Sequence, residues 1–278
     1  MIGNLILILI FNIFIILIFL YVLIFIYKLI FGVQNNVKYE TIFEICQKLT
    51  KDRDNSHDIK HMVQVYLNSM KIYKNMCSLR KENLNSEMYT MIMIVSLMHD
   101  IYDHKYDVDG NQKEKLATEL IKIGLGKDKI ESIFKIIDRI SFSYEKRKRE
   151  EIGIMNQPYI FVELNDFERE IRDIVSDADK LEAMGIFGIQ RCLEYTKRQI
   201  LNNEYVALSN KELTVELVKH CEEKLFILLD KYYIRTYYGR ELAKRKQTLM
   251  VDNVISRLKY NNMNEEAERI QLEYKSNI

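Results

Sequence analysis

Histidine and aspartate side chains that could hold a metal ion lie in three separated segments of the chain. His99 and Asp100 directly follow the apolar run 91–98, while His61 lies upstream and the turn 177–179, with two aspartates, lies downstream. Imidazoles and carboxylates suit Mn²⁺, Fe²⁺, Mg²⁺, Ni²⁺ or Zn²⁺, and such an ion can activate water and polarise a phosphoryl oxygen. Because unpaired charge at the end of a buried helix is costly, a cation is the expected partner of these carboxylates. We therefore interpret the chain as a hydrolase that uses one divalent metal ion.

The elements that must position these side chains are expected to be helices. The 278 residues include one proline and nine glycines, and 48% of them are hydrophobic. So few helix-breaking residues favour long helices joined by short polar turns, and the chain is long enough to bury a large core. The predicted fold class is therefore all-α.

Apolar periodicity and capping residues indicate where the helices around the site lie. Asn85 or Ser86 can cap a helix whose segment 88–98 is apolar nearly all round, so we expect this helix in the middle of the domain. The segment 171–195 is expected to form one or two helices, and 211–256 a long helical portion.

The N-terminal segment is long and apolar. Residues 5–27 contain no charged side chain, and at about 1.5 Å per residue a helix there could cross a hydrocarbon core of about 30 Å. A cleaved signal peptide is the alternative, but it needs a basic start and a small-residue cleavage site, which are missing. We expect a transmembrane helix at 4–32, through which the protein would contact a membrane, and a linker at 33–39. Because Lys28 and Lys38 follow this helix and no Lys or Arg precedes it, we predict a single-pass membrane protein with a cytoplasmic catalytic domain.

The charge balance disfavours one class of partner. The formal net charge is +1, and no basic stripe interleaved with aromatic residues occurs, so bulk nucleic acid is not an expected partner. The four cysteines lie far apart and lack metal-ligand spacing, which is typical of reduced thiols. The sequence leaves the oligomeric state open.

Several motifs occur in the order typical of a known superfamily. His61, the pair His99-Asp100 and the segment Ala178-Asp179-Lys180-Leu181 resemble the H…HD…D signature of the HD superfamily of metal-dependent phosphohydrolases. Further segments resemble its small stand-alone YedJ/YpgQ-type hydrolases, namely 56–61, 97–103, 140–143, 174–185 and 236–245. The resemblance covers about residues 43–250. It implies an HD-domain helical bundle, which we place at 40–260, followed by a polar C-terminal tail at 261–278.

The resemblance also implies roles for matching side chains. The implied metal ligands are His61, His99, Asp100 and Asp179. Asp179 is preferred to Asp177 because it occupies the family's Ala-Asp-Arg-Leu position, and Asp177 is the reserve ligand. The implied catalytic residues are Asp103 and His57. The implied substrate-binding residues are Lys105, Asp177, Lys180, Lys224 and Arg245.

Ordinary structural roles are the alternatives for several of these residues. Asp103 could orient or deprotonate the attacking water, or it could pair with a surface lysine. His57 could contact the leaving group or cap a helix, and Lys224 and Arg245 could reach phosphate oxygens or form a solvated helix face. Gln64 stands where these relatives commonly have arginine, which alters phosphate affinity only if that arginine contacts the substrate.

The implied reaction is hydrolysis of a phosphoanhydride or phosphoester in a small phosphorylated molecule. A nucleotide is the favoured substrate, with a nucleoside triphosphate cleaved to monophosphate and pyrophosphate. A phosphodiesterase is one alternative, and a non-catalytic HD-fold nucleotide sensor or scaffold at a membrane is another. The charged run 145–151 is interpreted as a solvated helix or loop, with a lid over the site or a contact with anionic lipid as the alternatives.

Overall fold

The computed structural model describes residues 38–51, 59–103, 107, 109–153, 160–202, 209–230 and 232–275. All regular elements in these ranges are helical, which confirms the predicted all-α class for the described part of the chain. The described helices belong to a compact unit that begins at Tyr39. The α-helices are α2 (Tyr39–Leu49), α3 (Ile59–Arg80), α4 (Ser86–Met98), α5 (Gln112–Lys122), α6 (Lys127–Ile137), α7 (Phe142–Glu151), α8 (Asp166–Glu182), α9 (Ile186–Asn202), α10 (Asn210–His220), α11 (Ile227–Asp230), α12 (Tyr237–Tyr260) and α13 (Asn264–Ile270), with π-helical turns η1 (Cys221–Leu225) and η2 (Gln271–Lys275).

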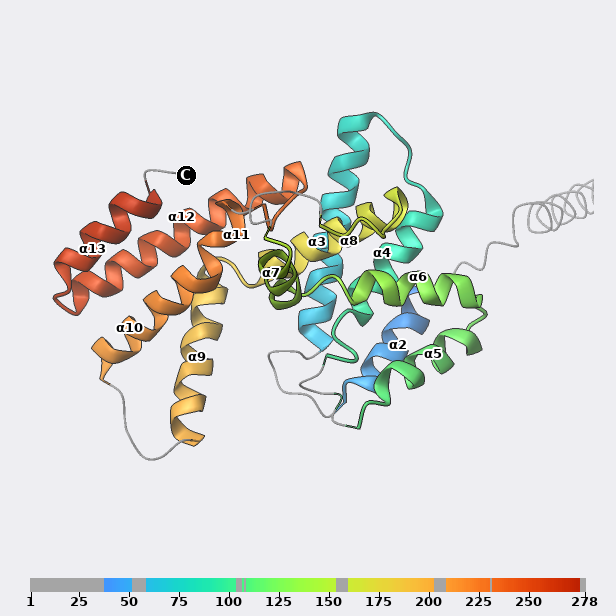
Figure 1. Ribbon diagram of the computed structural model, residues 1–278, viewed down its shortest axis with the longest axis horizontal. Coiled ribbons are helices and arrows are strands. Elements are labelled where there is room, and N and C mark those ends of the chain that lie inside the picture. Colours follow the sequence, from blue (N-terminus) through green and yellow to red (C-terminus); the bar gives the residue numbers. More distant parts are fainter. Residues whose placement is uncertain are drawn as a thin grey trace, which may run out of the picture. The chain divides into compact units, whose positions relative to one another are not determined.

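The centre of the unit is formed by α3, α4 and α8, each of which packs against the other two (Figure 1). In α4 the side chains of Ile92, Ile94, Val95 and Leu97 are fully buried, and those of Met91 and Met93 nearly so. Burial of one such side chain stabilises a fold by about 1.5–3 kcal/mol. The predicted central place of this helix is therefore confirmed, and its C-terminal end delivers His99 and Asp100 to the interior.

The remaining helices pack on two sides of this centre. α2 and α6 pack on α4, and α5 packs on α2 and α6. α9, α10 and α13 pack on the long helix α12, which itself contacts α3 and α8 (Figure 1). The segment expected as a polar tail includes α13, whose Ala267 and Ile270 are fully buried.

Helix boundaries near the site follow from identifiable residues. Asn85 caps α4, because its side-chain oxygen accepts from the backbone N–H groups of Glu87 and Met88 at 2.9 Å. The segment predicted as one or two helices is two, α8 and α9, which are separated at Gly185 with a φ of +86°. The C-terminal helical portion is broken twice, by the π-helical turn η1 and by the non-helical stretch before Tyr237.

The predicted transmembrane helix at 4–32 lies outside the described residues. Within the ranges that the structure describes, no helix is both long and apolar enough to cross a membrane. The two longest, α3 with 22 residues and α12 with 24, carry lysine and arginine side chains along their length. The predicted localisation, a single-pass membrane protein with a cytoplasmic domain, is corrected on this finding.

Candidate metal centre

Three helices bring four of the predicted side chains together. His61 lies in the first turn of α3, His99 and Asp100 follow α4, and Asp179 lies near the end of α8. His61 Nε2 lies 3.7 Å from Asp100 Oδ2 and 3.4 Å from Asp179 Oδ1. His99 Nε2 lies 3.5 Å from the same oxygen of Asp100 and 3.8 Å from that of Asp179. Potential ligand atoms of His61, His99 and Asp100 all lie within 4.8 Å of one another, so the cluster could hold a metal ion.

The orientation of His99 suits a metal ligand. Its Nδ1 lies 2.8 Å from the Ser96 carbonyl oxygen, and because a carbonyl only accepts, Nδ1 carries the hydrogen in the neutral ring. The lone pair of that ring is then on Nε2, which is buried and has no hydrogen-bond partner among the described residues. A buried polar atom without a hydrogen bond costs free energy, and a cation between it and the two carboxylates would remove that cost.

Electrostatics within the cluster also favour a bound cation. Burial lowers the pKa of His99, but Asp100 and Asp179 outweigh it and raise this pKa to about 9. Burial would raise the pKa of Asp179, yet the neighbouring imidazoles of His61 and His99 hold this pKa well below its usual range. The carboxylates thus favour positive charge at this point, which a divalent cation could supply.

The cluster opens into a pocket of about 360 Å³ that also contains Asp103. Asp103 is held near the cluster by its own backbone, whose N–H donates to the Asp100 carbonyl at 3.2 Å. Lys224, on the π-helical turn η1, lines the same pocket. The structure therefore brings Asp103 and Lys224 together with the four predicted ligands.

The other predicted residues have different places. Lys180 borders the pocket, but its ammonium is buried and donates to Ser176 Oγ and, at 3.2 Å, to Glu145 Oε2. Arg245 is exposed on α12 and is not part of the pocket lining. The predictions for His57 and Lys105 lie outside the described residues.

Asp177 is turned away from this pocket and fastens α8 to the start of α12. Its carboxylate accepts from the backbone N–H groups of Arg235 and Thr236 and from Thr236 Oγ1, at 2.7–3.0 Å. Burial raises the pKa of Asp177 to about 6, although Lys180 and Thr236 oppose this rise. Gly239 makes the approach feasible, because a Cβ there would lie 2.8 Å from Asp177 Oδ2. The structure thus places the reserve ligand where it holds the two residues that precede α12, while Thr236 itself caps that helix.

The charged run 145–151 forms most of α7, but it is only partly solvated. Glu145 and Arg149 are fully buried, whereas Arg147 and Glu150 on the same helix are exposed. Glu145 Oε1 accepts from Arg149 and Arg235, and Oε2 accepts from Arg172 and Lys180. The solvated-helix interpretation is therefore wrong for Glu145 and Arg149, which lie one helical turn apart on the buried face of α7.

Sequence reasoning missed several side chains of the pocket. Ser141, Ser143 and Arg147 line it from the start of α7, and Arg191 lines it from α9. The motif 140–143 already indicated that this stretch matters, but it assigned no role to its serines. Arg147 lies in a run of charged residues that looks uniformly solvated, and no motif includes Arg191 on α9.

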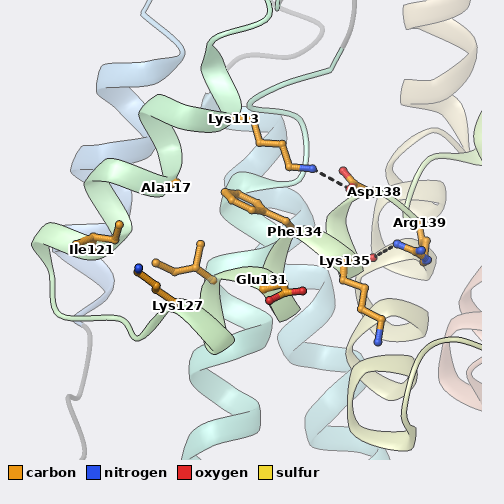
Figure 2. A pocket seen from close by; sticks show the side chains of 10 residues that line it. Lys113, Ala117, Ile121, Lys127, Glu131, Phe134, Lys135, Asp138 and Arg139 are labelled. Carbon is orange, nitrogen blue, oxygen red and sulfur yellow. Dashed lines mark hydrogen bonds and ion pairs between the residues drawn. The ribbon is translucent and has the colours of Figure 1, made fainter.

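A second, more open groove of about 520 Å³ lies between α5 and α6 (Figure 2). Its rim carries cations that already have partners: Lys113 pairs with Asp138 at 2.9 Å, and Arg139 pairs with Glu163 at 2.5 Å. Asp138 borders both hollows and accepts from Tyr102 Oη at 2.9 Å on the side of the metal cluster. His61 and His99 line the smaller pocket and not this groove, so the candidate metal site lies in the smaller pocket.

Comparison with known proteins supports the fold. Neither a protein-family model nor a curated protein sequence matches the chain. Bacillus subtilis YpgQ in complex with ADP is 19% identical with a TM-score of 0.54, covering 81% of this chain and 96% of YpgQ. An HD-superfamily hydrolase from Bacillus thuringiensis is 17% identical with a TM-score of 0.55, covering 82% of this chain and 99% of that one. The Lin1889 protein of Listeria innocua is 23% identical with a TM-score of 0.51, covering 79% and 94%. The described helices therefore have the HD-domain fold that the sequence motifs predicted.

Proposed function

We propose that this protein is a metal-dependent phosphohydrolase that acts on a small phosphorylated molecule. The observation that carries the proposal is the meeting of His61, His99, Asp100 and Asp179 in the lining of one pocket, where the buried Nε2 of His99 has no hydrogen-bond partner among the described residues. These four residues would hold one divalent ion. The donor set, two imidazoles and two carboxylates, is compatible with Mn²⁺, Mg²⁺, Fe²⁺, Ni²⁺ or Zn²⁺ and selects none of them.

A bound divalent cation would polarise a phosphoryl oxygen and lower the pKa of water. The protein's own residues orient the ligands, accept a proton and bind phosphate. The Ser96 carbonyl fixes the ring of His99 through Nδ1, so its Nε2 faces the pocket. Asp103 borders the pocket beside the cluster, where its carboxylate can accept a proton from the attacking water. Lys224 supplies positive charge for phosphate oxygens.

A nucleotide is the proposed substrate. The pocket lining combines carboxylates suited to a cation with basic side chains suited to phosphate. The solved structure of YpgQ, which shares the fold, holds ADP. The proposed reaction is cleavage of a nucleoside triphosphate to the monophosphate and pyrophosphate.

The test is turnover by the purified protein loaded with Mn²⁺, measured on nucleoside triphosphates and on a chromogenic phosphodiester, with products separated by chromatography. Monophosphate and pyrophosphate are the expected products, and Asp100→Asn should abolish their formation. A protein that contains the metal but turns over neither substrate would contradict the proposal and favour a nucleotide sensor. Faster cleavage of the diester than of any nucleotide would favour a phosphodiesterase.

A further inference from the structure

The end of the pocket formed by α7 has the features of a phosphate site distinct from the metal ligands. Ser141, Phe142 and Ser143 line the pocket at the N-terminus of this ten-residue helix. Ser141 is the N-cap residue, yet its side chain accepts no hydrogen bond from the helix. The first N–H groups of a helix have no partner within the helix, and together with the helix dipole they attract an anion.

A second observation shows that this pocket is built for a ligand. His99 Nε2, on a side chain that is 2% exposed, borders the same pocket and has no hydrogen-bond partner among the described residues. The pocket therefore offers an anion-attracting helix terminus and a buried, unpaired nitrogen within one volume of about 360 Å³.

Basic side chains add positive charge to the pocket that the N-terminus of α7 lines. Arg147 lies in α7 four residues after Ser143, and its guanidinium lies 5.5 Å from the centre of the Tyr144 ring. Tyr144 in turn stacks on Phe161, with ring centres 6.1 Å apart, so the arginine rests on a packed surface. Lys224 reaches the pocket from η1, where Phe226 N–H donates to the Cys221 carbonyl across a π-helical turn. Such turns rotate the following residues relative to a regular helix and occur frequently at functional sites.

The pocket lining carries charges of both signs. Asp100, Asp103, Asp138 and Asp179 contribute carboxylates, and Arg147, Arg191 and Lys224 contribute cationic side chains. A ligand with a single phosphate would satisfy only part of this surface. A chain of phosphates could reach the cation site with one group and the basic side chains with the others.

We propose that the first turn of α7 and the Arg147 guanidinium bind the phosphate groups of the substrate that are not at the metal, so that the pocket selects compounds with two or more linked phosphates. This inference rests on the function proposed above and deepens it by assigning a specificity residue. Arg147 acts on binding and selectivity and is not a catalytic residue.

Lys148 provides a matched control for Arg147. Both are cationic residues of α7, and both approach Glu151, at 3.8 Å from Arg147 and 3.9 Å from Lys148. Their side chains are 65% and 40% exposed, so neither substitution removes a buried side chain. Arg147 lines the pocket and Lys148 does not.

The first experiment measures binding without any metal. Inorganic tripolyphosphate and orthophosphate are titrated calorimetrically in EDTA into the full-length protein, Arg147→Gln and Lys148→Gln. We expect tripolyphosphate to bind more tightly than orthophosphate, Arg147→Gln to weaken it by about tenfold or more, and Lys148→Gln to leave it within about twofold. Equal affinity for the two anions, no tripolyphosphate binding at millimolar concentration, or equal behaviour of the two variants would overturn the inference.

The second experiment measures selectivity with Mn²⁺ present. Arg147→Gln should lower the ratio of kcat/KM for a nucleoside triphosphate to kcat/KM for a chromogenic phosphodiester by about tenfold, mainly through KM for the triphosphate. An unchanged ratio in an active enzyme would refute the specificity role and leave the phosphohydrolase proposal intact. If tripolyphosphate binding depends on Arg147 but the protein turns over no substrate, the hydrolase proposal is refuted and the proposed phosphate site is supported.

Discussion

Replacing Glu145 by glutamine removes the carboxylate on which four buried or nearly buried cations converge. Oε1 accepts from Arg149 at 2.8 Å and from Arg235 at 2.7 Å, while Oε2 accepts from Arg172 at 2.5 Å and from Lys180 at 3.2 Å. The side chains of all four donors are at most 6% exposed. Glutamine keeps the shape but places an N–H donor against these N–H donors and removes the negative charge that the four cations share, although Arg172 and Arg235 still pair with Asp173.

The expected loss is large. Breaking a buried ion pair by removing one partner costs about 3–5 kcal/mol. For a domain of this size each kcal/mol lowers Tm by about 2–4 °C, so Glu145→Gln should lower Tm by about 6–20 °C. Glu150→Gln is the control, because it makes the same chemical change at an exposed position of α7 and should cost less than about 0.5 kcal/mol. Equal melting temperatures of the two variants, by calorimetry at pH 7, would refute the central place of Glu145.

Glu145→Gln should also change how the stability of the protein depends on pH in acid. Burial alone would raise the pKa of Glu145, but the surrounding cations, Lys180 and Arg172 foremost, hold it far below its ordinary value of 4.5. A depressed pKa stabilises the folded state above the unfolded-state value, and this stabilisation is lost as the pH falls below it. The stability difference between the natural protein and Glu145→Gln should therefore shrink below pH 4.5 by up to about 1.4 kcal/mol per pH unit. A difference that stays constant from pH 7 to pH 3 in chemical denaturation would contradict this.

Three further outcomes are expected. Gly239→Ala should destabilise the protein by about 1–3 kcal/mol in urea denaturation, because the added Cβ would lie 2.5 Å from Thr236 Oγ1; an unchanged midpoint would disprove that close approach. Ile94→Ala, at a fully buried site of α4, should cost about 2–5 kcal/mol, whereas Ile121→Ala, at a 53% exposed site, should cost less than about 0.5; similar costs would disprove the central place of α4. Saturating Mn²⁺ at about 100 times its Kd should stabilise the natural protein by about 2.7 kcal/mol in thermal unfolding, and Asp100→Asn should lose most of this gain; an equal gain in the variant would remove Asp100 from the ligand set.

Much of the site could be predicted because its residues lie near the ends of helices. The apolar segment of α4 predicts a central helix, and the two polar residues that follow it must then meet a partner in the interior. The motif order added His61 and Asp179, and the fold brings all four within a few ångströms.

The rest depended on side-chain directions and on contacts between distant segments. Glu145 and Arg149 are indistinguishable in sequence from their solvated neighbours. They are interior because Glu145 binds Arg172 of α8 and Arg149 lies against Tyr232 and Tyr233. Asp177 and Asp179 differ by two positions, which on a helix points them about 160° apart. One therefore binds the backbone just before α12 while the other faces His61. The π-helical turn that aims Lys224 is likewise invisible to a search for regular helical periodicity.

The most direct test of the metal centre is a crystal structure of the protein grown with Mn²⁺, with anomalous scattering recorded near the manganese edge. We expect one strong peak between His61 Nε2, His99 Nε2, Asp100 and Asp179, with ligand distances of about 2.0–2.3 Å. A peak bound elsewhere, or a manganese-free cluster in a protein that elemental analysis shows to contain the metal, would contradict the proposal that these residues form the metal centre.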